Sequence, residues 1–360
     1  MLAAPGAHAV GVETRELVNP GQPDVMAALQ GRTERRDRVL MVEHWYPGVK
    51  GTGQVEPYGT LLRDGRTRVL LHGGAFRGAQ ALPGDFPLVI LSHGYPGNRL
   101  LMSHLGENLA SKGYRVVSVD HADSTYGDPA YLGGQAFGST LVNRPLDTAF
   151  VAQAMGGDRV AVAGYSMGGY GALVSGGAGV ARAALAEAGL AGSLWAQHCE
   201  VVADVRLRAV VCFGPWGRQR GLWDAAGMAG LSVPALIIAG DQDHVSGYDD
   251  GMRLIFAEAV GVTRHLLTFQ RAGHNAGAPI PAPIESWARV AGLDFVPFDH
   301  YADPVWDTVR MNNIAQHFVT AFLDLHLKGG DTAGYLTPDF AGFAGGTSGA
   351  LRLETLTPAR

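Results

Sequence analysis

The chain has 360 residues, of which 47% are hydrophobic and 17% charged, and its formal net charge at pH 7 is −5. This composition is typical of a soluble globular protein and excludes a disordered or fibrous chain. The small negative charge gives no reason to expect nucleic acid as a partner, and no apolar run approaches the roughly 18 residues that suggest a membrane span.

Cysteine content and the first residues bear on the cellular compartment. The first residues lack the basic n-region of a secretory signal. Cys199 and Cys212, the two cysteines, make neither a disulfide framework nor a zinc pattern, which favours the cytoplasm, although export after removal of a leader stays open. Cys212 lies in the apolar run "AVVCFG" and is predicted to be a core residue.

Predicted strands and helices alternate along the chain. Strands are predicted at residues 38–47, 67–74, 86–94, 114–121, 158–166, 207–215, 234–243 and 263–274. Helices are predicted at residues 99–113, 143–157, 167–179, near 250–260 and at 309–328. This alternation predicts an α/β fold, in which a mainly parallel sheet carries helices on both faces. Because no Pro- or Ser-rich linker divides the chain, residues 1–360 are expected to form a single domain with loop insertions.

The segment "AVAGYSMGGYGAL" (residues 162–174) places Ser166 between glycines, where a predicted strand turns into a predicted helix. A strand, a tight turn and a helix are the context of a nucleophile elbow. The glycines permit the strained turn and the close approach of strand and helix. A Gly-rich phosphate loop is the alternative, but neither a Lys nor a second Ser or Thr follows at P-loop spacing. Ser166 is therefore predicted to be a nucleophile.

A serine hydroxyl needs a base that takes its proton and a third group that orients the base. On this fold the acid follows the nucleophile and the histidine follows the acid. Asp243, after the run "ALIIAG", and His274, after "LLTFQ", fit this order. Asp241 is the alternative acid, but it stands closer to the strand and is expected to brace the turn. Other histidines fit the role of base less well. His244 directly follows the acid, and His93 precedes the predicted oxyanion loop. His44, His72 and His121 lie on or beside predicted strands.

Stabilisation of an oxyanion requires hydrogen-bond donors. One donor is predicted to be the backbone N–H of Met167, directly after the nucleophile, and the other that of Tyr95 in "SHGYPGNR". The alternative for "HGYPG" is an ordinary turn at the end of a strand.

These motifs resemble those of α/β-hydrolases of the dienelactone-hydrolase-like superfamily, over most of residues 35–275. Within it the chain is similar to platelet-activating-factor acetylhydrolases, and further to bacterial cutinases and polyester hydrolases. The resemblance is carried by "LVILSHGYPGNRLLMSHLGENLASKGYRVVSVDHADST", "VAVAGYSMGGYGAL", "ALIIAGDQD" and "RAGHN". Dienelactone hydrolases have cysteine at the elbow, whereas this chain has Ser166, which argues for esterase chemistry.

Three features are expected to shape the substrate site. Trp216, in "CFGPWGRQRGLW", stands where polyester hydrolases carry an aromatic wall beside the substrate, and a packed core tryptophan is the alternative. Residues 122–142 and 275–307 are long for loops of so compact a fold, and a lid or pocket wall is the expectation for them.

Together these observations predict a serine carboxylic-ester hydrolase that forms an acyl-enzyme. Short- to medium-chain or aromatic esters are the expected substrates, and no metal or cofactor is expected. An amidase or polymer depolymerase with the same triad is the alternative within enzymes. A non-catalytic ligand-binding relative is the alternative outside them.

Overall fold

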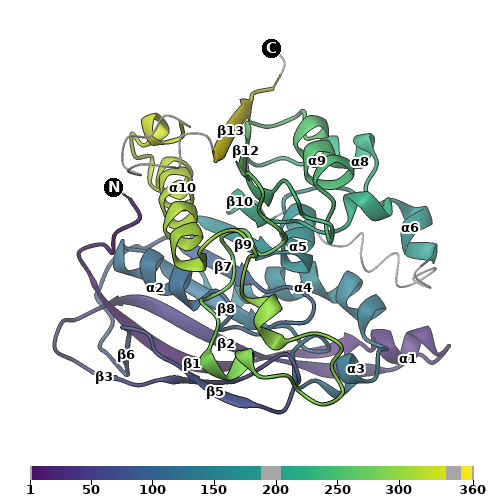
Figure 1. Cartoon of the computed structure of the whole chain (residues 1–360), viewed down its shortest axis with the longest axis horizontal. Helices are drawn as coiled ribbons and strands as arrows, with labels where there is room; N and C mark the ends of the chain where they lie inside the picture. The colour runs from purple at the N-terminus through teal and green to yellow at the C-terminus, as the bar shows by residue number, and fades with distance from the viewer. Residues whose placement is uncertain (1, 188–203, 338–349, 359–360) are drawn as a thin grey trace.

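The computed structural model describes residues 2–187, 204–337 and 350–358. Within them, eleven strands form one sheet in the order β13-β12-β11-β10-β9-β7-β8-β2-β1-β6-β3, and β4 and β5 form a separate two-stranded sheet. Figure 1 shows the main sheet running through the molecule with helices on both of its sides.

The bounds of the elements follow. The strands are β1 (Ala9–Pro23), β2 (Arg35–Gly48), β3 (Gln54–Val55), β4 (Tyr58–Leu61), β5 (Arg68–Leu71), β6 (Phe76–Arg77), β7 (Leu88–Ser92), β8 (Arg115–Asp120), β9 (Val160–Tyr165), β10 (Leu207–Phe213), β11 (Ala235–Gly240), β12 (Arg264–Phe269) and β13 (Leu351–Leu356). The α-helices are α1 (Val25–Leu29), α2 (Ser103–Ser111), α3 (Pro129–Leu132), α4 (Phe137–Met155), α5 (Met167–Ser175), α6 (Arg182–Glu187), α8 (Ala225–Ala229), α9 (Arg253–Glu258) and α10 (Thr308–Lys328). Single turns of other helix types are η1 (Arg218–Arg220), η2 (Tyr248–Met252), η3 (Ile284–Trp287), η4 (Pro297–His300) and η5 (Ala333–Tyr335).

The central strands β8, β7, β9, β10, β11 and β12 are parallel. They are flanked by β2 and β13, each antiparallel to its neighbour. Parallel strands place their carboxyl ends at one edge of the sheet, where open α/β folds bind ligands. The turns after β7, β9, β11 and β12 therefore meet at one edge.

Apolar side chains fill the space on both faces of the sheet. Along β7, Val89 and Leu91 belong to the cluster under α2 and α10, whereas Leu88 and Ile90 belong to the cluster under α4, α5, α8 and α9. Successive side chains of a strand point to opposite faces, so a continuous apolar run is what a strand covered on both sides requires. The predicted α/β architecture is confirmed.

Helix α4 begins at Phe137, six residues before the predicted start of 143, and α3 lies just before it. The predicted loop 122–142 is therefore partly helical. The misprediction has a physical cause, because Pro145 is typical of a first helical turn but lies inside this helix. Proline offers no N–H to the carbonyl of Leu141, four residues earlier, and the hydroxyl of Tyr170 donates to that carbonyl at 3.0 Å.

The sequence does not predict four strands of the main sheet, namely β1, β3, β6 and β13. The strand predicted at 67–74 is β5, which pairs with β4 outside the main sheet. Cys212 is fully buried, as predicted, and Cys199 lies outside the described residues. In the part of the chain that the structure describes, no helix combines the length and apolar character needed to cross a bilayer.

Candidate active site

Ser166 lies between β9 and α5 with a φ of 55°, a left-handed backbone angle that is uncommon for a residue with a side chain. The neighbouring glycines are required by close contacts. A Cβ on Gly164 would lie 2.0 Å from the carbonyl oxygen of Gly168, and a Cβ on Gly168 would lie 1.9 Å from that of Ser92. The G-x-S-x-G pattern thus lets the strand turn into the helix at once, and strain of this kind is concentrated at functional sites.

His274 and Asp243 form a hydrogen-bonded pair beside this turn. Nδ1 of His274 lies 2.8 Å from Oδ2 of Asp243. The other oxygen of Asp243 accepts the backbone N–H groups of Val245 at 2.8 Å and Ser246 at 2.9 Å. Burial alone would raise the pKa of Asp243, but the hydrogen bond from His274 and these two backbone bonds hold that pKa below its ordinary value. The carboxylate is therefore ionised at neutral pH and fixed in direction.

Asp241, the alternative acid, has a different environment. Its Oδ1 accepts the backbone N–H of Arg271 at 2.6 Å, a bond that joins the turn after β11 to the turn after β12. This is the bracing contact that the sequence favours for Asp241. His244 is exposed.

A cavity of about 290 Å³ lies at this edge of the sheet, and Ser166, His274 and Tyr95 all line it. One wall comes from residues between 299 and 304, within the segment 275–307 that is expected to shape the pocket. Arg63 also lines the cavity, and its guanidinium lies 4.7 Å from the centre of the Phe295 ring. A larger groove of about 750 Å³ lies beside β4 and β5, and its lining includes none of Ser166, Asp243 and His274.

The wall formed by residues 299–304 is attached to the histidine turn by hydrogen bonds. The side-chain amide of Asn275 donates to the carbonyls of Asp299 at 2.9 Å and Ala302 at 2.6 Å, and its oxygen accepts the hydroxyl of Tyr165 at 2.8 Å. Asp303 Oδ2 accepts the backbone N–H of Gly273 at 2.6 Å. The wall and the turn that carries His274 are therefore held together.

The two predicted oxyanion donors lie near the nucleophile. Met167 is the first residue of α5, so its N–H has no acceptor within that helix. Tyr95 follows Gly94 in the loop after β7, and a Cβ on Gly94 would lie 3.5 Å from the Cβ of Ser166. The backbone of this loop therefore passes close to the serine.

Trp216 is half-buried, and its backbone N–H donates to the carbonyl of Ser166 at 3.1 Å. Its ring begins a row of edge-to-face aromatic contacts. Trp216 contacts Phe137 at 5.3 Å, Phe137 contacts Tyr95 at 5.6 Å, and Tyr95 contacts Tyr131 at 5.3 Å between ring centroids. This row reaches the cavity through Tyr95, and contact between substrate and Trp216 stays a prediction.

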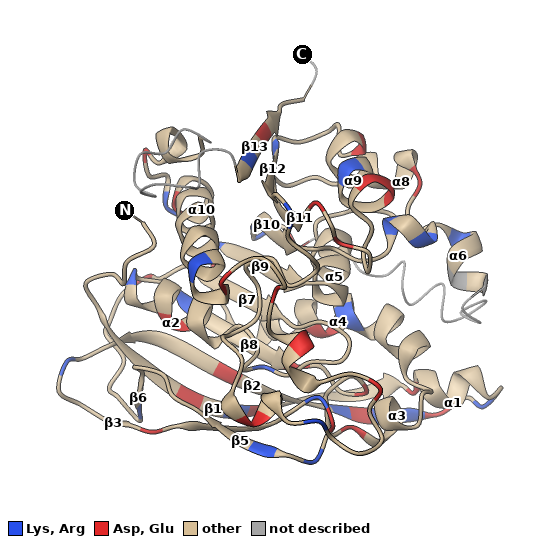
Figure 2. Ribbon diagram, in the orientation of Figure 1, with Lys and Arg blue, Asp and Glu red and all other residues tan. Residues whose placement is uncertain are grey.

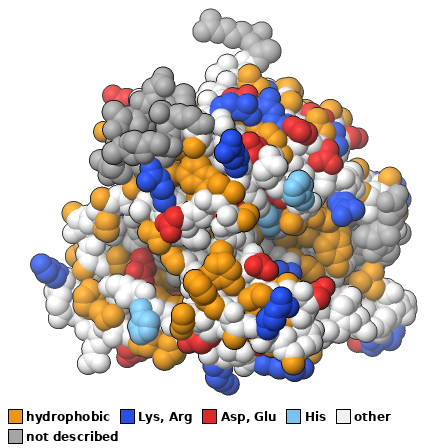
Figure 3. Space-filling view, viewed as in Figure 1, with side chains coloured by type: hydrophobic (Ala, Val, Ile, Leu, Met, Phe, Trp, Pro, Cys, Tyr) orange, Lys and Arg blue, Asp and Glu red, His pale blue; other side chains and the backbone are white. Residues whose placement is uncertain are grey.

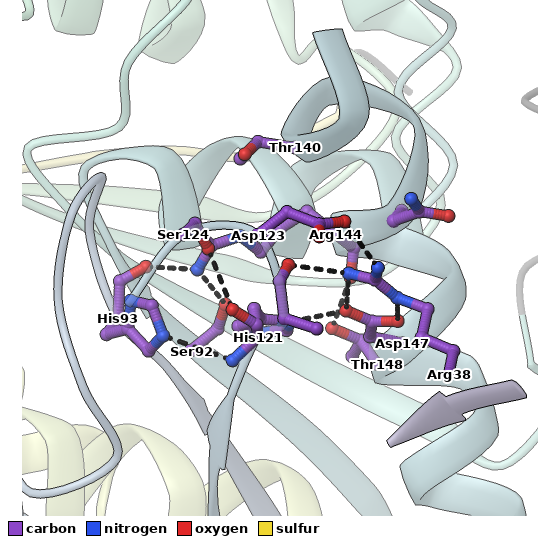
Figure 4. A network of polar contacts seen from close by, with 12 residues as sticks. Arg38, Ser92, His93, His121, Asp123, Ser124, Thr140, Arg144, Asp147 and Thr148 are labelled. Carbon is purple, nitrogen blue, oxygen red and sulfur yellow. Dashed lines mark hydrogen bonds and ion pairs between the residues drawn. The ribbon is translucent and has the colours of Figure 1, made fainter. Parts of the chain in front are cut away.

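A second serine–histidine–aspartate chain lies beneath the loop after β7 (Figure 4). Ser92 Oγ lies 2.9 Å from Nε2 of His121, and Nδ1 of His121 lies 2.9 Å from Oδ2 of Asp147. All three side chains are at most 1% exposed. Burial, together with the nearby charge of Arg144, lowers the pKa of His121 to about 3, which makes its imidazole a poor base at neutral pH. We interpret this chain as structural, because a substrate cannot reach a fully buried hydroxyl.

The fold is also found in known proteins. A protein-family model described as "alpha/beta hydrolase fold" matches residues 87–174, which span β7 to α5 and include the loop of Tyr95 and the turn of Ser166. Among solved structures, a ferulic acid esterase from Streptomyces cinnamoneus matches with a TM-score of 0.69 and 22% identity, and the match covers 98% of each chain. The chain has the α/β-hydrolase fold. A search of curated proteins found no match.

Within this α/β-hydrolase fold, the residues that the sequence singled out come from five separate turns, those after β7, β9, β10, β11 and β12, and gather at one edge. The sequence did not single out Arg63 or Arg144, since neither stands in a recognisable motif. Among the residues that the structure describes, no three His, Cys, Asp or Glu side chains gather as a metal site would require.

Proposed function

We propose that this protein is a serine carboxylic-ester hydrolase that forms an acyl-enzyme intermediate. One observation carries the proposal: the Asp243–His274 pair stands beside a cavity that is also lined by Ser166, a serine at positive φ. A nucleophile, a base and a group that orients the base are the requirements for acyl transfer by serine. The likeness to a ferulic acid esterase supports the proposal at the level of the fold.

In this mechanism the Oγ of Ser166 attacks the ester carbonyl while Nε2 of His274 takes its proton. The N–H groups of Tyr95 and Met167 donate to the oxyanion of the tetrahedral intermediate. His274 then protonates the leaving alcohol as the C–O bond breaks. Water repeats the sequence on the acyl-enzyme, releasing the acid and restoring the serine hydroxyl. Asp243 holds the imidazole in one tautomer and stabilises its charged form.

The cavity supports small substrates. Its volume of about 290 Å³ is near the lower end of the range of small-molecule sites. Short- to medium-chain acyl groups or one aromatic ring fit this size. The structural neighbour is described as an esterase of ferulic acid, which is itself an aromatic acid. The face seen in Figure 3 carries hydrophobic side chains near its middle and charges of both signs around them, and Figure 2 shows both signs mixed along the elements. Such a surface gives no advantage to a polyanionic substrate.

Ser166→Ala is the first test. We expect this substitution to lower kcat for p-nitrophenyl ester hydrolysis by about 10⁴-fold or more while the protein stays folded. His274→Ala should lower kcat by nearly as much. Labelling of wild-type protein by a p-nitrophenyl phosphonate, read by intact mass, should occur and should be lost in Ser166→Ala. Substantial activity of purified Ser166→Ala would refute the assignment.

A substrate panel separates the proposed reaction from its alternatives. Esters should be hydrolysed faster than the matching anilides and faster than a polyester film, with kcat/KM highest at intermediate acyl length. Faster cleavage of anilides or polymer would support the amidase or depolymerase alternative. A wild-type protein that is neither labelled by the phosphonate nor active on any of them would support a non-catalytic binding protein.

A further inference from the structure

Arg144, on α4, places its guanidinium against the backbone of His93, two residues before Tyr95 (Figure 4). The side chain is 0% exposed. It donates to the backbone oxygens of His93 at 2.5 Å and Gly94 at 3.2 Å, and to the hydroxyl of Ser124 at 3.0 Å. None of these acceptors is a carboxylate, in contrast to Arg38 in the same network, which holds both Asp123 and Asp147.

A buried charge that is not paired with an opposite charge is costly. Transfer of an ion from water into the interior is unfavourable, and an apolar side chain of similar volume would avoid that penalty. Arg144 stays largely protonated at neutral pH, since burial lowers its pKa only to about 9 while the charge of Asp147, which is not bonded to it, acts to raise that pKa. A role beyond packing would account for the retention of this charge in such a place.

The direction of one peptide group indicates what that use is. The carbonyl of Gly94 is held by Nη2 of Arg144 and also by Nδ1 of His93 at 2.7 Å. Nε2 of His93 accepts the backbone N–H of His121 at 3.2 Å, so the proton of this neutral ring is on Nδ1, and Nδ1 is the donor to Gly94. In a trans peptide the N–H points opposite to the C=O. With the Gly94 carbonyl directed to Arg144 in the interior, the N–H of Tyr95 is directed to the other side.

We propose that Arg144 is a positioning residue for the oxyanion hole, which fixes the Gly94–Tyr95 peptide so that the N–H of Tyr95 faces the reacting carbonyl. The two bonds to consecutive carbonyls, of His93 and Gly94, hold the loop at two points and resist rotation of the peptide. The positive charge behind the Gly94 carbonyl also polarises the peptide, which strengthens its N–H as a donor. This inference rests on the proposed ester hydrolysis.

The neighbouring network keeps Arg144 in place. Ser92 Oγ lies 3.5 Å from Nη1 of Arg144 and 2.9 Å from His121, which is bonded in turn to Asp147. Asp147 is bound by Arg38 at 2.6 and 2.9 Å. The buried serine–histidine–aspartate chain thus supports the oxyanion loop from below and performs no acyl transfer of its own.

The test compares Arg144→Gln and Arg144→Lys with Val151→Ala, a variant of another buried residue on α4. All three are measured for kcat and KM on p-nitrophenyl acetate, for inhibition by phenylboronic acid, whose tetrahedral adduct occupies the oxyanion hole, and for thermal unfolding. We expect Arg144→Gln to lower kcat by about 10- to 100-fold, somewhat less than loss of a donor itself, with a parallel loss of boronate affinity and a KM near that of wild type. Arg144→Lys, which keeps the charge but can reach fewer acceptors, should fall between Arg144→Gln and wild type.

A kcat and a boronate affinity for Arg144→Gln equal to those of Val151→Ala would overturn the proposal, because only stability would then depend on Arg144. If Arg144→Gln does not fold, Arg144→Lys decides, and a kcat equal to that of wild type would count against the proposal. These outcomes differ from failure of the proposed function, in which wild-type protein neither hydrolyses the ester nor reacts with the phosphonate. That failure would overturn both.

Discussion

At the residue scale, the structure separates two aspartates that stand only two positions apart. Asp243 Oδ2 is bonded to His274, and Asp241 Oδ1 is bonded to the backbone N–H of Arg271. Asp243→Asn should leave the imidazole in the wrong tautomer and lower kcat by about 10⁴-fold, whereas Asp241→Asn should lower mainly the melting temperature. Steady-state kinetics and thermal unfolding of both variants check this. A larger loss of kcat in Asp241→Asn would transfer the role of the acid to that residue.

The residues named from the sequence share one property: each stands in a short motif at the end of a predicted strand or directly after it. Order along the chain and strand ends were enough to predict that Ser166, Asp243 and His274 come together, because parallel strands carry their carboxyl ends to one edge. Arg144 offers no such signal. It lies in the middle of a helix, and its contacts to His93 and Gly94 exist only after α4 has packed beneath the loop.

At the scale of elements, most central strands were predictable because their apolar runs are continuous, as burial on both faces demands. Other elements were not, for identifiable reasons. β1 contains mostly exposed or half-buried residues in its second half, so its pattern is weak. The start of α4 was misplaced because Pro145 resembles the first turn of a helix, and a tertiary contact from Tyr170 satisfies the carbonyl to which the proline cannot donate.

That contact gives a prediction about how α4 is stabilised. Tyr170→Phe should destabilise the protein by about 1–3 kcal/mol, because it leaves the buried Leu141 carbonyl without this donor. Pro145→Ala should restore a backbone N–H to the same carbonyl, so Tyr170→Phe should cost less in that background. A double-mutant cycle by denaturant unfolding measures the coupling. Equal costs of Tyr170→Phe in the two backgrounds would show that the hydroxyl does not substitute for the missing helix bond.

At the scale of the whole molecule, several histidines are buried in a neutral form. Burial lowers the pKa of His44, His265 and His317 to about 4 in each case, and that of His121 to about 3. In the unfolded chain these side chains titrate near 6.5. Between pH 6.5 and about 4 the unfolded state therefore binds more protons than the folded state.

The free energy of unfolding should accordingly rise with pH over this window and level off above it. Each buried histidine contributes about 1.4 kcal/mol per pH unit to the slope. Asp147 contributes little there: burial acts to raise its pKa, but Arg38 lowers it to about 2, so this carboxylate loses its stabilisation only as pH falls below its unfolded value of about 3.9. Urea unfolding from pH 4.5 to 7 measures the slope. His265→Gln, which keeps a side-chain partner for Thr355 at the amino end of β12, should reduce the slope by the contribution of one proton, about 1.4 kcal/mol per pH unit. A stability that stays constant across this range would show that the buried histidines are protonated in the folded protein, or that they remain equally neutral in the unfolded one.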